Sequence, residues 1–382
     1  MVLKHVRGRQ RALLVAFFTA TAARAHPAAA QTLADRLAIH GYLTQGYAVA
    51  DSHQLVGIPH SGTFDYRRAA LLFRFKGTPK DAFVVQLANR ELGDSPIDDF
   101  TSEVQLDWAF YERRLGSKTT LRIGKAPIPM GIFNETRYVG TLLPFYRAPL
   151  GFYQEGTFTS ETLNGLVLTR LITPGSRWKL SGSLFGGGFD YLQAGTIVTP
   201  GDTNPSYTVT RAKVKNLLGA QLWLQTPLTG LRVGLGGERR DDYGAFDGAT
   251  SDTHGTHDWW ASVDGNFERL SARAEYRQFA FNSGTIHATT YYGQIGYRVL
   301  EALTVNVQRD VMDVRYVIPG GELELPYSRD NALGIDYAFA SNIVGKFEIH
   351  AARGLGAEEP LDVLAGRAVQ ENYLIASLSV SF

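Results

Sequence analysis

Charged side chains that could contact a solute recur along this sequence, and most of them are arginines. A guanidinium stays charged at every physiological pH and offers planar donors that fit a carboxylate or a phosphate. Rings of such groups around a narrow aqueous opening select ions and small solutes by charge. The candidate residues lie on the polar faces of predicted strands or in one long connection: Arg68, Arg74, Lys76, Arg122, Glu135, Arg137, Arg147, Glu155, Arg273 and Arg277.

A second interpretation assigns these arginines to the wall that carries them. Asp107, Asp264 and Glu275 fall on polar strand faces and could neutralise the arginines as ion pairs. At this stage both interpretations, solute contact and wall pairing, stand for each single arginine.

Other kinds of chemistry find little support. The chain has no Cys, which excludes disulfides, thiolate catalysis and Cys-based zinc sites. His254, His257 and Asp258 lie close together but lack a recognised metal-ligand spacing, so a solvated segment is favoured over a metal site. No G-x-S-x-G motif marks a catalytic serine. We therefore expect no enzyme activity, no cofactor and no metal.

The element that positions the charged side chains is a β-strand with two different faces. In the last eleven residues, Asn372–Phe382, apolar residues alternate with small polar ones. A tilted strand needs roughly 9–11 residues to cross a bilayer, so this stretch is long enough. About sixteen such segments follow one another from Leu37 onward, an even number as in single-chain bacterial barrels. A soluble β-sandwich also alternates, but it buries its apolar face against a second sheet.

Connection length separates these two folds. Short turns alternate with long polar segments, and residues 282–286 are a modest exception; the long segments are 50–63, 92–102, 126–162, 188–211, 240–256, 312–329 and 354–371. A barrel inserted from one side has short turns at one end and long loops at the other, whereas a sandwich does not sort its loops in this way. We predict an all-β, transmembrane antiparallel β-barrel of about sixteen strands, with both termini at the short-turn end.

The amino-terminal residues have the features of an export signal. A basic stretch between residues 4 and 11 precedes a short apolar run, and small residues then offer two cleavage patterns, after Ala25 and after Ala30. We predict a signal peptide at residues 1–30 and a single barrel domain at residues 31–382. Without the signal peptide the chain keeps 33 of its 38 basic residues against 37 acidic ones, a net charge of −4 that argues against nucleic acid as a partner.

The longest connection, residues 126–162, is too apolar for a solvated outer loop. Ile132, Phe133, Phe145 and Phe152 need a surface to pack on, and four prolines stiffen the segment. Long ordered loops of this kind are usually functional. We predict that this connection folds into the barrel and narrows its interior.

Two stretches of the chain resemble known outer-membrane proteins. An aromatic terminal residue on an alternating strand, here Phe382, is similar to the end of Gram-negative outer-membrane barrels. The segment R-I-G-K-A-P-I-P-M-G-I-F-N-E-T-R, Arg122–Arg137, resembles the strand-five end and third loop of phosphate-selective porins and related trimeric porins. The resemblance implies a homotrimer of sixteen-stranded barrels that passes small hydrophilic, often anionic, solutes by diffusion. Phosphate-selective members line the channel with many lysines, whereas residues 126–162 contain none.

Together these observations predict a porin of the outer membrane. Its expected partners are small hydrophilic solutes or ions, the lipid of the outer membrane and two further copies of the chain. One alternative is an outer-membrane barrel enzyme, a lipase or protease with an active site at the rim. The other alternative is a soluble, carbohydrate-binding β-sandwich.

Overall fold

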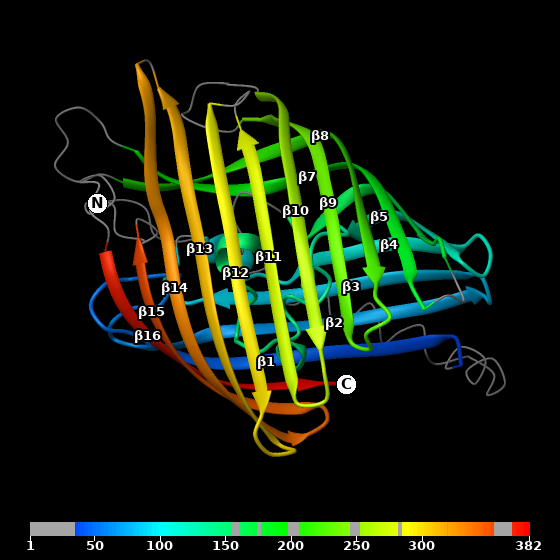
Figure 1. Ribbon diagram of the computed structural model, residues 1–382, viewed down its shortest axis with the longest axis horizontal. Coiled ribbons are helices and arrows are strands. Elements are labelled where there is room, and N and C mark those ends of the chain that lie inside the picture. The colour runs from blue at the N-terminus through cyan, green and yellow to red at the C-terminus, as the bar shows by residue number, and fades with distance from the viewer. Residues whose placement is uncertain are drawn as a thin grey trace, which may run out of the picture.

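The chain folds into one closed antiparallel barrel. A computed structural model describes residues 35–95, 97–154, 160–173, 177–197, 206–244, 253–281, 285–318, 320–354 and 369–382. Sixteen strands among these residues pair in chain order, and β1 pairs with β16 to close the barrel (Figure 1). The prediction of an all-β antiparallel barrel with about sixteen strands is therefore confirmed.

The strands differ in length, and the short helices lie in the connections. The strands are β1 (Leu37–Ala50), β2 (Thr63–Thr78), β3 (Asp81–Leu92), β4 (Gln105–Arg114), β5 (Thr119–Pro127), β6 (Thr162–Leu171), β7 (Lys179–Ile197), β8 (Ser206–Gln225), β9 (Leu231–Tyr243), β10 (Thr253–Asn266), β11 (Leu270–Phe281), β12 (Ile286–Arg298), β13 (Leu303–Ile318), β14 (Gly321–Ala340), β15 (Ile343–Gly354) and β16 (Val369–Ser381). The helices are α2 (Asp98–Thr101), η2 (Gly140–Leu142) and α3 (Leu150–Tyr153). Among the described residues, no helix has the length and apolar character needed to cross a membrane.

The two terminal strands close the barrel without leaving a free edge. Thr44 of β1 lies opposite Ser379 of β16, and the two hydroxyl groups are 2.9 Å apart. At the last residue, the Gly41 amide donates to the Phe382 carbonyl at 2.9 Å, and the Phe382 amide donates back at 3.0 Å. Closure satisfies the hydrogen-bonding groups that an open sheet would expose at its edge.

The barrel carries its apolar residues on the outside. On β16, Leu378 is 48% exposed, while Tyr373, Ile375 and Ser379 on the other face are buried. The same arrangement recurs around the barrel: outward-facing large side chains that are exposed include Leu222, Ile295, Leu333 and Ile349. Buried inward-facing residues include many polar ones, among them Gln221, Gln294, Glu348 and His350. The two-faced strands predicted from period-two alternation are present, with apolar groups outward and polar groups inward.

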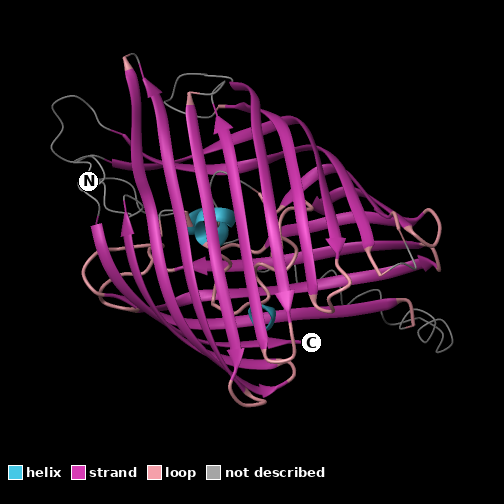
Figure 2. Ribbon diagram, in the orientation of Figure 1, coloured by secondary structure: helices cyan, strands magenta, loops and turns pink. Residues whose placement is uncertain are grey.

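Two of the predicted long loops are wrong, because strands occupy most of them. β7 and β8 extend through much of 188–211, with Ile197 opposite Ser206. β13 and β14 extend through 312–329 and stay paired as far as Ile318 opposite Gly321, near the upper edge of Figure 2. At the ends of β13 and β14 the polar residues lie on the outer face, as in the Arg315–Glu322 ion pair at 3.0 Å. Apolar residues such as Met312 and Val314 are buried on the inner face, the reverse of the arrangement elsewhere in the barrel.

The short turns lie at the end of the barrel where β1 begins and β16 finishes. The Lys76 amide, close to the β2–β3 turn, donates to the Arg36 carbonyl at 2.8 Å. The Ser381 amide donates to the carbonyl of Asn342 in the β14–β15 turn at 3.0 Å. The predicted signal peptide, residues 1–30, lies outside the described residues and stays a prediction.

Leu333 offers a test of the outer face. It is half exposed and sits between Val307 and Ile349 on the neighbouring strands. Leu333→Arg is expected to lower the free energy of unfolding by about 2–4 kcal/mol, because a guanidinium near the middle of a bilayer loses its hydration. Urea titration of protein folded into phospholipid vesicles measures this change. Leu333→Phe is the control and should stay within about 1.5 kcal/mol of wild type; equal stability of all three proteins would show that this face does not contact lipid.

Candidate functional site

The connection between β5 and β6 lies inside the barrel, as predicted. We call residues 128–161 the inward loop; it is described at 128–154 and 160–161. Figures 1 and 2 show its helix α3 enclosed by the strands. Its backbone amides reach distant parts of the wall: Gly131 donates to Gln221 of β8 at 2.8 Å, and Gly151 donates to Asp310 of β13 at 2.8 Å.

Apolar packing holds the inward loop against the barrel wall. Phe133, Phe145 and Phe152 are each at most 4% exposed. Phe133 and Phe152 pack against Tyr292 of β12, with ring centroids 6.4 and 6.0 Å apart. The inward placement removes these rings from water, which explains why so apolar a connection does not project outward. Leu142, another apolar residue of the inward loop, is not packed in this way and is 59% exposed.

Gly131 shows how closely the inward loop approaches the wall. Its φ is +58°, in the left-handed region that glycine adopts without strain. A Cβ atom at this position would lie 2.6 Å from the Tyr153 hydroxyl and 2.7 Å from Oε1 of Glu275. The turn therefore depends on glycine for both its conformation and its contact with β11.

Glu275 of β11 is the central acceptor for this turn. Its Oε1 accepts from the Ile132 amide at 3.0 Å and from the Ser262 hydroxyl at 2.5 Å. Its Oε2 accepts from the Tyr292 hydroxyl at 2.7 Å and from the Tyr153 hydroxyl. The carboxylate is 3% exposed, so its desolvation is offset by these four donors.

Two of the predicted pore arginines hold the inward loop in place. Arg68 of β2 is 1% exposed and donates to the Tyr146 carbonyl at 2.7 Å. Arg277 of β11 is 2% exposed, donates to the Phe152 carbonyl at 2.6 Å and pairs with Asp258 at 2.5 Å. Their guanidinium groups bind the inward loop and the wall around it. For Arg277, the ion pair with Asp258 agrees with wall pairing, the second of the two interpretations of the sequence.

A second group of predicted residues meets at a more exposed place, which we call the aperture cluster. Arg74 of β2 and Arg122 of β5 both bind Glu112 of β4, at 2.5 and 3.2 Å. Arg122 also binds Glu135 of the inward loop at 3.1 Å. The two arginines are about a quarter exposed and Glu135 is 48% exposed, so water reaches this cluster.

On β9–β11 a matching group, the opposite cluster, lies beside the same stretch of loop. Arg273 of β11 and Arg232 of β9 bind the two oxygens of Asp264 at 3.0 and 2.8 Å. The Arg273 guanidinium also lies 5.5 Å from the ring centre of Phe133. Phe133 contacts the opposite cluster and Glu135 contacts the aperture cluster, and the two residues are only two positions apart. The inward loop therefore lies between the two clusters and touches both.

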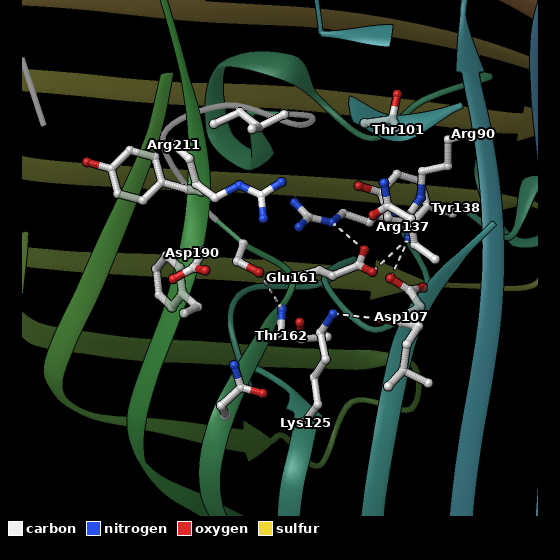
Figure 3. A pocket seen from close by; sticks show the side chains of 17 residues that line it. Arg90, Thr101, Asp107, Lys125, Arg137, Tyr138, Glu161, Thr162, Asp190 and Arg211 are labelled. Atoms are coloured by element: carbon white, nitrogen blue, oxygen red, sulfur yellow. Dashed lines mark hydrogen bonds and ion pairs between the residues drawn. The ribbon is translucent and has the colours of Figure 1, made fainter. Parts of the chain in front are cut away.

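Arg137 belongs to a third, more buried group around a cavity of about 430 Å³ (Figure 3). It donates to Glu161 at 3.3 Å and to the Tyr153 carbonyl at 2.8 Å. Arg90 of β3 binds both Glu161 and Asp107 at 2.8 Å. Burial raises the pKa of the Glu161 carboxyl; Arg90 and Arg137 oppose that shift and the Asp107 charge adds to it.

The remaining predicted residues are dispersed. Lys76 is exposed at the short-turn end of β2. Arg147 is buried, with its guanidinium 5.3 Å from the ring centre of Tyr66. Glu155 lies outside the described residues.

The fold does not bring His257 and Asp258 together as metal ligands. Asp258 faces inward and is bound by Arg277, whereas the adjacent His257 is exposed on the outer face. Within the described ranges, no group of three or more His, Cys, Asp or Glu side chains is arranged to hold a metal ion.

Sequence reasoning missed three acids of the inner wall. Glu112, Asp310 and Glu348 were not singled out, yet they bind Arg122, the Gly151 amide and the Tyr146 amide. Their position on polar strand faces was a usable signal. The partners of Asp310 and Glu348 lie 159 and 202 residues away, so no local pattern could have identified those contacts. Arg122 is ten residues from Glu112, across the β4–β5 hairpin.

Comparison with known proteins identifies the fold. Neither a protein-family model nor a curated protein matches the chain. Among solved structures, the trimer form of in-vitro folded OmpT, an outer membrane protein of Vibrio cholerae, matches 91% of this chain and 99% of its own at 13% identity, with a TM-score of 0.55. The outer membrane channel DcaP of Acinetobacter baumannii (9% identity, TM-score 0.57) and Salmonella typhi OmpF in complex with daunomycin (10% identity, TM-score 0.57) each match 91% of this chain and 97% of their own. At these identities the likeness shows the porin-like barrel fold.

Glu275→Ala tests whether the wall carboxylate holds the loop. The substitution leaves the Tyr153 and Tyr292 hydroxyls without their acceptor, at a cost of about 1–3 kcal/mol for each unsatisfied group, and leaves the Ile132 amide with only the Tyr153 hydroxyl as acceptor. Amide exchange across residues 131–133 should become at least roughly tenfold faster, measured by hydrogen–deuterium exchange and mass spectrometry. Ser262→Ala removes one donor to the same carboxylate and should leave the exchange almost unchanged. Unchanged exchange in Glu275→Ala would mean that apolar packing alone fixes the turn.

Proposed function

We propose that this protein is an outer-membrane porin that passes small hydrophilic solutes by diffusion. The observation that carries the proposal is the inverted barrel: apolar side chains face outward, charged side chains face inward, and the inward loop crosses the interior. In a bilayer, closure satisfies every strand edge, and a polar interior then permits water inside. The similarity to outer membrane proteins, one of them described as a channel, supports the same conclusion.

The narrow part of the path lies where the inward loop meets the aperture cluster and the opposite cluster. Four arginines, Arg74, Arg122, Arg232 and Arg273, face three carboxylates, Glu112, Glu135 and Asp264. The surplus positive charge is exposed to water and raises the local concentration of anions. Anionic solutes are therefore the favoured class. The phosphate-selective type is supported by the Arg122–Arg137 segment, whereas the lysine-free loop speaks against it.

The proposal includes location and assembly. An outer-membrane location agrees with the outward apolar belt and with a signal peptide at residues 1–30. A homotrimer is supported by OmpT, which is solved in a trimer form. Three copies would each keep their own path, because every barrel is closed by its own β1 and β16.

A liposome swelling assay tests the channel against the enzyme alternative. Purified protein in vesicles should admit small sugars and amino acids at rates that fall with solute size. The same preparation is assayed for lipid and peptide hydrolysis. Swelling without hydrolysis supports the porin; hydrolysis without swelling would replace it with the barrel enzyme.

The charge of the aperture is tested by reversal potentials in a salt gradient across a planar bilayer. Arg122→Gln should shift the potential toward cations, because a unit charge about 4 Å from a passing ion in water contributes about 1 kcal/mol. The expected change in the anion-to-cation permeability ratio is at most roughly fivefold, since salt screens the charge. Arg137→Gln should have a smaller effect, because Arg137 is only 4% exposed.

Arg113→Gln is the matched control for that measurement. Arg113 lies on the outer face of β4, is half exposed and pairs with Asp81 at 2.9 Å. Its loss removes the same charge without touching the interior. An equal shift in Arg113→Gln and Arg122→Gln would remove Arg122 from the solute path.

A further inference from the structure

The cavity beside Arg137 differs from the aperture in both position and chemistry. On β4, Asp107 lines the cavity and Glu112 belongs to the aperture cluster, five residues further toward the short-turn end. At about 3.3 Å per residue the two places are roughly 16 Å apart along the strand. A solute that enters from the long-loop end therefore meets the cavity before the aperture.

The cavity has the size and lining of a small-molecule site. Its volume of about 430 Å³ lies in the range of sites that enclose small organic ligands. Phe189 and Tyr191 of β7 give it an aromatic wall, and both side chains are almost fully buried. A single inorganic ion would leave most of this volume and the whole aromatic wall unused.

Two guanidinium groups converge on the cavity from different elements. Arg211 of β8 extends into it and points toward Arg137 of the inward loop (Figure 3). Arg211 is exposed, and among the described residues it has no acidic partner. Arg137 uses Nε and Nη1 for Glu161 and the Tyr153 carbonyl, and its Nη2 takes part in neither bond.

The charged side chains that line the cavity leave it positive, because Arg90, Lys125, Arg137 and Arg211 face Asp107, Glu161 and Asp190. Arg90 is matched by Asp107 and shares Glu161 with Arg137. Glu161 divides its carboxylate between Arg90 and Arg137, so it compensates neither guanidinium fully. Arg211 adds a further positive charge on the opposite side of the cavity.

We propose that this cavity binds a small organic carboxylate, held between the guanidinium groups of Arg137 and Arg211 with its organic body against Phe189 and Tyr191. The proposal rests on the proposed porin function and adds a solute class and a saturable binding step to it. Planar donors on two sides fit a carboxylate, and the aromatic wall fits an organic body.

Binding is tested in detergent micelles by isothermal titration, which requires no channel activity. The probes are benzoate, its uncharged isostere benzamide, and inorganic phosphate. Benzoate should bind, benzamide should bind at least about tenfold more weakly, and phosphate should not displace benzoate at equal concentration. Failure of benzoate to bind, equal binding of benzamide, or displacement by phosphate would each overturn the proposal.

Arg211→Gln should weaken benzoate binding at least about tenfold, the loss of a charge-assisted contact. Lys213→Gln is the matched control: it removes one charge two residues away on β8, from a side chain that does not line the cavity. Unshifted migration of the unheated proteins on a gel confirms that both variants fold. Benzoate binding by Arg211→Gln at wild-type strength would overturn the assignment.

Channel recordings separate this proposal from the function on which it rests. Wild type and Lys213→Gln should conduct simple salt equally and should both be blocked by benzoate, whereas benzoate should block Arg211→Gln at least about tenfold more weakly. Absence of conductance in plain salt would contradict the porin function, whereas the titration in micelles would still test the cavity site. Equal block in wild type and Arg211→Gln would sink the cavity site alone.

Discussion

Closure of the sheet by β1 and β16 is the constraint on which the rest of this structure depends. A strand in hydrocarbon cannot leave its amides and carbonyls unpaired, so the last strand must pair with the first. The Gly41–Phe382 hydrogen bonds complete that ring. Once the ring is closed and its outer face is apolar, the charged side chains of the membrane-level strands have only the interior to occupy. The inner wall therefore becomes a dense set of buried charges that need partners.

The inward loop supplies many of those partners. Most of its backbone is outside helices, so its amides and carbonyls need acceptors and donors from elsewhere. Glu275, Asp310 and Glu348 accept loop amides, while Arg68 and Arg277 donate to loop carbonyls. The wall thus satisfies the backbone groups of the loop, and the loop satisfies the buried charges of the wall. An isolated buried charge would be costly, but each of these five side chains is matched by a backbone dipole or an opposite charge.

The sequence was informative wherever the two faces of a strand meet different solvents. Period-two alternation located strands such as Asn372–Phe382, and the apolar 126–162 segment was correctly placed inside. The signal was missed in 312–329, which is strand and not loop, because the polar residues there lie on the outer face and apolar residues such as Met312 and Val314 are buried on the inner face. It also could not distinguish Arg68, which binds the loop, from Arg122, which stays partly exposed, because both occupy the same kind of position on a polar face. Long-range partners decide that difference.

The interior places charge at two levels with different access to water. At the aperture, arginines that are roughly a quarter exposed keep much of their hydration, so their attraction for a passing ion is weak and brief. Around the cavity the charges are almost fully buried, and low dielectric strengthens each contact. Conduction requires binding that is favourable enough for entry and weak enough for release. The cavity binds a solute more strongly than the aperture does, so it must still be able to release that solute. Release requires that one of its cations stays in contact with water, and the exposed Arg211 is that cation.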